Sequence, residues 1–302
     1  MTATPQKLKI ALVDMNDGHP NQAIRSFKTL IRGLFERARL ENPDLEAELI
    51  HVQPRNLEEV PPDDCDLYVC SGGPDSPVDG FEEKWCPAIR KFFDGVHGKW
   101  QSGREDAPGA LAICYSFEMA TMHFGVAEMA PREKRFGIMP AYTTAAGEES
   151  NLLGAFGERL FAWEHRYWNA VNLDEARLKE LGGAVYARES RDGVSKGEGL
   201  TSFRFTEGIE GTIFHPEADR AGALHWIQKP EQAEAVIEAY GKTTYDRMLK
   251  TLDDPNRLAR TYALLIPNWL NTSFNRLAPH RSWNEIPPVD YGVSMQAFAE
   301  AG

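Results

Sequence analysis

The sequence predicts an α/β protein with an open, mostly parallel sheet, flanking helices and a helical C-terminal extension. Three observations support this fold class. Short apolar runs that end at Gly, Pro or Asp alternate with longer segments whose apolar residues recur every three or four positions. The chain has 302 residues, of which 42% are hydrophobic, and this is enough for a large core. After Pro230 the strand-like runs stop and only helical periodicity remains.

Several short apolar runs are expected to form strands, because each is about four to eight residues long and is bounded by turn-forming residues. They span residues 7–14, 48–53, 66–71, 110–113, 184–188, 200–205 and 211–214. The segment 129–158 is less regular and rich in Gly, Ala and Thr, and we expect short antiparallel strands there. Because the early runs alternate with helical segments, they predict a parallel sheet that is covered on both faces.

Helices are expected between and after these runs. In residues 21–40 the side chains of Ile24, Phe27 and Ile31 fall on one face, and Asn21 is a suitable N-cap. Further helices are predicted at residues 85–96, 116–124, 232–240, 244–252 and 256–265. The last of these is predicted to end before Pro267, because proline inside a helix removes a hydrogen bond.

The change of pattern near Pro230 predicts two parts, an α/β domain at residues 1–229 and a helical extension at residues 230–302. The apolar residues of the extension need a surface to cover, because isolated helices of this length are marginal in water. We expect them to pack on the core near the sheet edge, with Trp269 and Phe274 as anchors. A free tail that binds a partner is the alternative.

The chain carries 45 acidic and 33 basic residues, which gives a formal net charge of −12. Because such a chain repels phosphate backbones and anionic lipids, no nucleic-acid or membrane partner is expected. No apolar run approaches the ~18 residues of a membrane helix, and residues 1–9 show no signal-peptide pattern, so we expect a cytoplasmic protein. The four cysteines should be reduced thiols, and no His or Cys spacing predicts a metal site.

Cys114 directly follows an apolar run and precedes a helical pattern. A cysteine at such a strand-to-helix turn sits on an exposed elbow, where the positive end of the helix dipole favours the thiolate. This position predicts a nucleophile. A buried cysteine that only fills a small core site would give the same local pattern. The other cysteines, Cys65, Cys70 and Cys86, are expected to pack as small hydrophobic residues.

A histidine and a glutamate flank Pro216 after the last predicted strand. On an extended segment, residues two apart share a face, so His215 and Glu217 are expected to point the same way. A carboxylate beside an imidazole fixes its tautomer and raises its basicity, as a general base requires. A surface His and Glu at a strand end is the plainer interpretation. With Cys114, the pair has the composition of a nucleophile–base–carboxylate triad.

The segment 71–77, Ser-Gly-Gly-Pro-Asp-Ser-Pro, follows another predicted strand. Its two glycines let backbone N–H groups turn toward a ligand, and such groups can stabilise an oxyanion. An ordinary Gly-Pro turn is the alternative. No single motif is specific. The three motifs in this order, glycine loop, cysteine elbow and His-Pro-Glu, indicate a catalytic site far more specifically than any one of them does alone.

This order of motifs resembles that of the class I, or triad, glutamine amidotransferases, and among them the stand-alone GMP-synthase-like members. The resemblance implies a flavodoxin-like fold of three layers, with an open sheet between helices. It implies that Cys114 is the nucleophile, His215 the base and Glu217 the residue that orients the base. It also implies that the backbone N–H groups of Gly73 and Tyr115 bind the oxyanion.

The resemblance covers about residues 7–220, and it includes informative departures. Family elbows usually read Gly-x-Cys-x-Gly-x-Gln, whereas Glu118 stands here at the glutamine position. The family's Ser-His-x-Asp segment, which helps to hold the amino-acid end of glutamine, has its nearest match at His165, Arg166 and Tyr167, without the Ser and the Asp. We therefore expect Glu118, His165, Arg166 and Tyr167 to contribute to substrate binding, with Arg166 suited to clamp a carboxylate. Free glutamine is expected to be a weak substrate.

The resemblance implies an enzyme that cleaves a carboxamide through a thioester on Cys114 and releases ammonia or transfers the acyl group. No cofactor is expected. In the family, ammonia passes to a synthetase; since this chain has no GxxxxGK[ST] phosphate loop, a synthetase or acceptor enzyme would be a separate partner. Two alternatives stay open. One is a hydrolase of γ-glutamyl or biosynthetic amides, and the other is a non-catalytic binding or regulatory module on the same fold.

Overall fold

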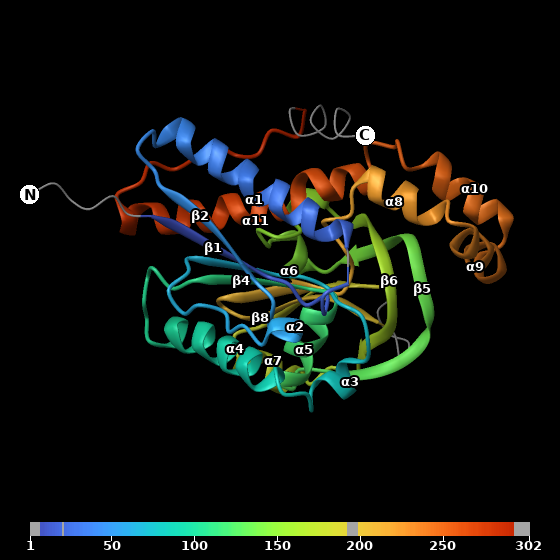
Figure 1. The fold of residues 1–302 in the computed structure, drawn as a ribbon, viewed down its shortest axis with the longest axis horizontal. Helices are drawn as coiled ribbons and strands as arrows, with labels where there is room; N and C mark the ends of the chain where they lie inside the picture. Colours follow the sequence, from blue (N-terminus) through green and yellow to red (C-terminus); the bar gives the residue numbers. More distant parts are fainter. Residues whose placement is uncertain (1–6, 20, 192–198, 293–302) are drawn as a thin grey trace, which may run out of the picture.

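A single sheet runs through the described part of this computed structural model, which comprises residues 7–19, 21–191 and 199–292 (Figure 1). Its strand order is β2-β1-β3-β4-β9-β8-β6-β5-β7. The strands that pair in parallel are β1 (Leu8–Val13), β2 (Ala47–Val52), β3 (Leu67–Cys70), β4 (Gly109–Ile113) and β9 (Ile209–Thr212). The strands that pair antiparallel with one another are β5 (Glu128–Thr143), β6 (Arg159–Val171), β7 (Ala184–Arg188) and β8 (Leu200–Thr206). Because β7 pairs with both β5 and β8, the antiparallel half closes on itself.

The predicted α/β class is confirmed, but the sheet is mixed rather than open and mostly parallel. Each apolar run singled out in the sequence overlaps a strand, and the run at 211–214 overlaps only the last two residues of β9. The antiparallel half rests mainly on β5 and β6, which are 16 and 13 residues long. The sequence pattern predicts only short strands at 129–158 and none at β6. Both long strands carry many charged and aromatic residues, so neither stands out as an apolar run.

Helices cover both faces of the parallel half (Figure 1). The main covering helices are α1 (Gln22–Glu41) and α11 (Leu258–Leu277) on one face, and α4 (Cys86–Gln101) and α5 (Tyr115–Phe124) on the other. Strand β1 separates the two cores, since Leu8, Ile10 and Leu12 pack with α1 and α11. Ala11 and Val13 pack with α4 and α5. A parallel strand of this kind is apolar on both faces, and it therefore reads as one continuous apolar run.

A third group of helices packs against the outer face of β5 and β6: α8 (Arg220–Ile227), α9 (Pro230–Tyr240) and α10 (Lys242–Lys250). Phe136 and Trp163 on the strands meet Ile227 and Met248 on the helices. The remaining short elements are α2 (Pro54–Leu57), α3 (Pro77–Gly80), α6 (Ala145–Glu148), α7 (Glu175–Glu180) and the 3₁₀ helices Gly154–Phe156 and Ala278–Arg281. No helix within residues 7–19, 21–191 and 199–292 is long and apolar enough to cross a membrane.

Helix α11 continues through Pro267, so the prediction that it ends before this residue is wrong. A proline inside a helix costs about 3 kcal/mol, because it lacks the N–H and crowds the preceding turn. On both sides of Pro267 the helix buries large side chains, among them Ile266 and Leu270. Burial of each such side chain contributes about 1.5–3 kcal/mol, and this outweighs the cost of the proline.

The C-terminal helices pack on the core, and Trp269 and Phe274 are both buried in it. Their place differs from the expected one, because α11 lies beside α1 over a face of the parallel half rather than at the sheet edge. The face of β1, β3 and β4 that α1 leaves uncovered is apolar, and α11 fills it. The division into parts at 229/230 stays a prediction, and truncation tests it.

Candidate active site

Cys114 lies at the turn between β4 and α5, where the sequence pattern predicts it. It is only 5% exposed and packs in the core, so the expectation of an exposed elbow is wrong. Its φ of 51° and ψ of −111° make a sharp turn with a positive φ at a non-glycine residue. Such a conformation costs about 1–3 kcal/mol and persists only where the surroundings hold it. The Cys114 N–H donates to Thr212 O at 2.8 Å, and Cys114 O accepts from the Glu118 N–H at 2.9 Å. Strand β9 and helix α5 therefore fix the elbow at the carboxyl ends of the parallel strands, where ligands bind in such sheets.

His215 and Glu217 follow β9, and their side chains meet. His215 Nδ1 lies 2.8 Å from Glu217 Oε1. The main chain of His215 is fixed by a bridge to β6, in which its N–H donates to Trp163 O at 2.8 Å. The Glu217 side chain is 1% exposed, and its Oε2 atom has no hydrogen-bond partner within the described residues. One carboxylate oxygen thus orients the imidazole and the other is left as a buried acceptor.

The surroundings of His215 favour its protonated form. Burial alone lowers the pKa of the imidazole, but charge and hydrogen-bond interactions with Cys114 and Glu217 outweigh it and raise the pKa well above its ordinary value. The imidazole of His215 is thus paired with Glu217, and Cys114 lies on its other neighbouring segment, at the turn beside the glycine loop. The thiolate is the form in which a cysteine attacks a carbonyl carbon, and the imidazole is the group that would take up its proton.

The glycine loop after β3 packs directly on these side chains. A Cβ atom built at Gly72 would lie 3.0 Å from His215 Cε1 and 3.1 Å from Cys114 Cβ, so a larger residue would push against both. A Cβ atom at Gly73 would lie 2.1 Å from a backbone carbonyl oxygen, so this approach of two chains requires glycine. The resemblance points to Gly73 for the oxyanion, and the structure brings the loop that carries it against Cys114 and His215.

Tyr115, the second expected oxyanion donor, is the first residue of α5. Backbone N–H groups in the first turn of a helix have no partner within the helix and are available to a ligand. The Ser116 hydroxyl donates to Ser71 O at 2.6 Å and so ties α5 to the glycine loop. This contact joins the two segments that carry Gly73 and Tyr115.

Glu118 is buried in the first turn of α5, just beyond the elbow, and is 3% exposed. Burial raises the pKa of its carboxyl to about 7, although the positive charges of Arg166 and His215 act in the opposite direction. Near neutral pH the carboxyl is therefore protonated for part of the time. The structure brings Glu118 within electrostatic reach of the expected triad, as the substrate-binding prediction requires.

The other expected substrate-binding residues lie on β6, where successive side chains point to opposite faces. His165 faces α8, with its ring centroid 5.2 Å from that of Trp226. Burial and nearby positive charges lower the pKa of His165 to about 4, so its ring is neutral at physiological pH. Tyr167 lies on the same face of the strand and is 52% exposed. Arg166 faces the other way.

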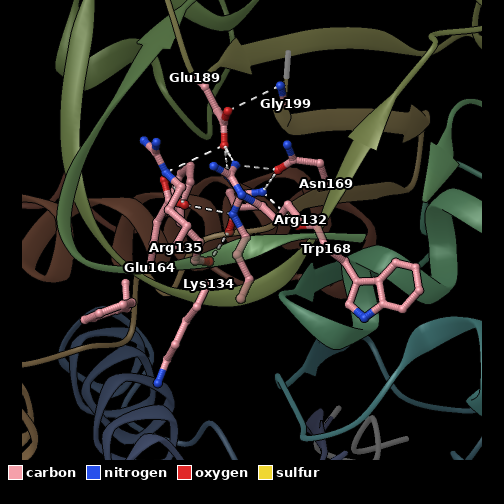
Figure 2. Close-up of polar contacts among 12 residues, drawn as sticks. Arg132, Lys134, Arg135, Glu164, Trp168, Asn169, Glu189 and Gly199 are labelled. Atoms are coloured by element: carbon pink, nitrogen blue, oxygen red, sulfur yellow. Dashed lines mark hydrogen bonds and ion pairs between the residues drawn. The ribbon is translucent and has the colours of Figure 1, made fainter. Parts of the chain in front are cut away.

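Arg166 belongs to a buried cluster of ion pairs between β5, β6 and the end of β7 (Figure 2). Its Nε donates to Glu164 Oε2 at 2.8 Å, and Arg135 Nε donates to the same oxygen at 2.8 Å. Further hydrogen bonds and ion pairs complete the cluster through Arg132, Trp168 O, Asn169 and Glu189. The Arg166 side chain is 1% exposed. Because protein acceptors occupy its guanidinium, Arg166 holds β6 in place and is not available to clamp a substrate carboxylate.

A cavity of about 800 Å³ opens beside His215, between the start of α1, strand β6 and helix α8. Trp163, His165 and Trp226 form its aromatic wall, and the rings of Trp163 and Trp226 meet edge to face at 5.2 Å. Arg25 and Asp219, which form an ion pair, also line it. This volume is within the range of roughly 300–1,000 Å³ that is typical of small-molecule sites.

The sequence pattern predicts neither Trp226 as part of the site nor the ion-pair cluster. Trp226 lies on α8, a short helix with weak periodicity. A signal for β6 is present: Trp163, His165 and Tyr167 alternate with Glu164 and Arg166, and this period of two is typical of a strand. Reading that alternation would have separated the cavity-facing residues from the buried ones.

The remaining expectations concern metals and the other cysteines. Within the described residues, no group of three or more His, Cys, Asp or Glu side chains is placed to hold a metal ion. Cys65, Cys70 and Cys86 are free and buried, and burial raises the pKa of each thiol, to about 12 for Cys65 and about 11 for Cys86. All three cysteines pack in a hydrophobic cluster, as the sequence predicts for cysteines that act as small hydrophobic residues.

No family model and no curated protein matches the sequence. Among solved structures, a glutamine amidotransferase from Methylobacillus flagellatus gives a TM-score of 0.57 at 12% identity, covering 93% of this chain and 98% of that chain. A glutamine amidotransferase from Thermotoga maritima gives a TM-score of 0.54 at 14% identity, covering 89% of this chain and 97% of that chain. At such identities the likeness shows a shared fold. The resemblance inferred from the motifs is thus confirmed at the level of the fold.

Proposed function

We propose that this protein is an amide-cleaving enzyme of the glutamine amidotransferase type, with Cys114 as nucleophile, His215 as acid and base, and Glu217 as the residue that orients His215. The observation that carries the proposal is the hydrogen bond of the His215 imidazole with Glu217, together with the position of His215 and Cys114 side by side against Gly72. The fold shared with glutamine amidotransferases supports it. A non-catalytic module has no need for this convergence of three reactive groups.

The reaction follows from the roles of these groups. The Cys114 thiolate attacks the carboxamide carbon, and the oxyanion that forms accepts hydrogen bonds from the backbone N–H groups of Gly73 and Tyr115. His215 gives its proton to the departing nitrogen, the C–N bond breaks, and a thioester remains on Cys114. His215 then removes a proton from water, which attacks the thioester and releases the acid. No cofactor is required for these steps.

The substrate is a small-molecule amide, and Glu118 argues for one other than free glutamine. The buried carboxyl of Glu118 stands where the related elbows carry a neutral amide, so the acyl end meets a group of different charge. Released ammonia or acyl group would pass to a separate synthetase or acceptor enzyme in the cytoplasm. A γ-glutamyl-type or biosynthetic amide hydrolase is the alternative enzyme, and the large cavity beside His215 favours it.

Cys114 should react with iodoacetamide at pH 7 before the other three cysteines. Burial raises the pKa of the thiols of Cys65, Cys70 and Cys86 and so suppresses their reactive thiolate form, whereas Cys114 lies beside His215, which can accept its proton. Intact mass measured over time should show one adduct, and peptide mapping should place it on Cys114. Labelling of all four cysteines at one rate in the folded protein would contradict the proposed nucleophile.

The Glu118→Gln variant should have a higher free energy of unfolding than the wild type at neutral pH. At acid pH this advantage should disappear. The pKa of Glu118 is raised from 4.5 to about 7, so the folded state resists ionisation of this carboxyl. That destabilisation is absent below about pH 4.5 and complete above about pH 7, and it amounts to on the order of 1–3 kcal/mol. Urea unfolding between pH 4.5 and 8 measures the difference. The exposed Glu36→Gln variant serves as the control. The prediction is contradicted if the free energy of unfolding of Glu118→Gln, relative to the wild type, is as independent of pH as that of Glu36→Gln.

A further inference from the structure

We propose that the cavity beside His215 binds the leaving half of the substrate, and that this half is an amine that carries an aromatic ring. The inference rests on the proposed function and specifies its substrate class. The cavity lies on the side of the site that carries His215 and Glu217. His215 and Glu217 contribute to its lining, whereas Cys114 and Gly73 are not among the described residues that line it. In the proposed reaction His215 protonates the leaving nitrogen, so a group attached to that nitrogen would extend into this space.

The volume of the cavity favours a leaving group larger than ammonia. Ammonia is about as large as water, which takes up about 30 Å³ in the liquid. The cavity of about 800 Å³ is therefore far larger than the release of ammonia requires. A substituted amide fits it, with the acyl half at Cys114 and the amine half beyond His215.

The wall nearest to His215 is aromatic. Trp163 is directly opposite His215 in the bridge between β6 and the residues after β9. Residues paired in this way have Cβ atoms about 4.5–5.5 Å apart, so the indole begins close to the imidazole. The Trp226 ring packs edge to face on the rings of both Trp163 and His165, at 5.2 Å in each case. Because the His165 ring is neutral at physiological pH, these three rings form an uncharged surface suited to a flat ring.

The ribbon that carries this wall is held from behind and from the side. Behind it lies the ion-pair cluster of Arg166 and Glu164 (Figure 2). Lys134 points away from that cluster in Figure 2, and its Nζ lies 5.5 Å from the centroid of the Trp226 ring. The rings are therefore fixed before a ligand arrives, which reduces the entropy lost on binding.

A polar group at the same end of the cavity suits the nitrogen of the leaving amine. Glu217 lines the cavity, is almost completely buried, and keeps an Oε2 atom without a hydrogen-bond partner within the described residues. Protein atoms cover this oxygen, so an N–H of the ligand would reach it only after the Glu217 side chain shifts toward the cavity. The cavity thus places the buried Glu217 carboxylate and His215 at one end and aromatic rings along its wall.

The overall reaction is R–CO–NH–R′ + H₂O → R–COOH + R′–NH₂, where R′ carries the aromatic ring. Cys114 Sγ forms a bond to the carbonyl carbon, and the C–N bond breaks as His215 supplies a proton to the nitrogen. Water then cleaves the thioester, which regenerates the thiol. No oxidant, reductant or second substrate is needed.

Binding of the amine half alone tests the inference without knowledge of the acyl half. Three amines of equal charge serve as probes in calorimetry of the full chain: 2-phenylethylamine, 2-cyclohexylethylamine and methylamine. We expect the phenyl compound to bind about tenfold more tightly than the cyclohexyl compound, and methylamine not to bind measurably. Trp226→Leu should remove the preference for the phenyl ring, and Trp226→Phe should retain most of it. Trp100→Leu, at the opposite end of the strands, is the matched control and should keep the wild-type order. Equal binding of the phenyl and cyclohexyl compounds by the wild type would overturn the inference.

Turnover separates this inference from the proposed function. The γ-glutamyl amides of the same three amines and glutamine itself form a series with a constant acyl half. We expect kcat/KM to be highest for the phenylethyl amide, by at least tenfold over glutamine. If glutamine is cleaved best, the inference fails and the proposed function stands. If no amide is cleaved and iodoacetamide labels all four cysteines at one rate, the proposed function fails as well.

Discussion

Replacing His215 by alanine is expected to lower amide cleavage by about 10⁴-fold, because the protein loses the acid and base that both halves of the reaction require. The rate of amine or ammonia release with saturating substrate measures the effect. Circular dichroism should stay close to the wild type, since the backbone bridge from residue 215 to Trp163 O does not depend on the side chain. Thermal unfolding should occur at a lower temperature, because the buried Glu217 loses its partner.

Glu217→Gln should have a smaller effect, about 10²-fold, because the imidazole remains but loses its anionic partner. It should also change the pH profile of kcat/KM. Glu217 is one of the groups that raise the pKa of His215, so the alkaline limb, where His215 loses its proton, should shift to lower pH in this variant. His280→Ala, an exposed histidine at the far end of the sheet, should behave like the wild type. A Glu217→Gln enzyme with full activity and an unshifted alkaline limb would show that Glu217 does not orient the base.

Truncation after Lys229 is expected to prevent stable folding. It removes α9, α10 and α11, and with α11 it removes side chains that are fully buried in the core: Leu265, Ile266, Leu270, Phe274 and Leu277. Each contributes about 1.5–3 kcal/mol, so their combined loss is comparable to the whole net stability of about 5–15 kcal/mol of a typical protein. The face of β1 that packs on α11 would also be exposed to water. Soluble yield, far-UV circular dichroism and thermal unfolding check this result.

A chain that ends at Gly292 provides the matched control for truncation, because it keeps all three helices and removes only residues outside the described ranges. It should fold and melt like the full chain. A truncated chain ending at Lys229 that is soluble, monomeric and equally stable to heat would mean that residues 230–302 are separate from the core. In that case the alternative of a partner-binding tail would replace the core-packing account.

The candidate reactive residues could be placed from the sequence because each stands next to an element boundary. Cys114 follows the apolar strand β4 and precedes a helix, and His215 and Glu217 follow β9. Because β4 and β9 are neighbouring parallel strands, topology alone brings these residues together at the carboxyl ends of the strands. The glycine loop follows β3 for the same reason. Parallel strands carry such information because burial on both faces makes them apolar throughout.

The walls of the cavity were harder to predict, for physical reasons. On β6 the buried face is filled with ion pairs such as Arg166 with Glu164, so its buried residues are charged and an apolar pattern never appears. Trp226 lies on a helix of eight residues, too short for periodicity to stand out. Helix α11 continues through Pro267 because tertiary packing outweighs the local preference of proline. In each case the deciding contacts are distant in the sequence.

The alternation of β6 also bears on how such a protein diverges and how it can be redesigned. The groups that would break the bond are held by the parallel half, whereas Trp163 and His165 belong to the antiparallel ribbon and form much of the surface that a substrate would meet. Substitutions at these two positions reshape that surface and leave the salt-bridged inner face intact. Changes at Glu164 or Arg166 instead strand a buried charge, at a cost of about 3–5 kcal/mol. Of these positions on β6, His165 is therefore the one at which a substitution disturbs the fold least, because Trp163 is buried against α8 and α10 and Glu164 and Arg166 form buried ion pairs.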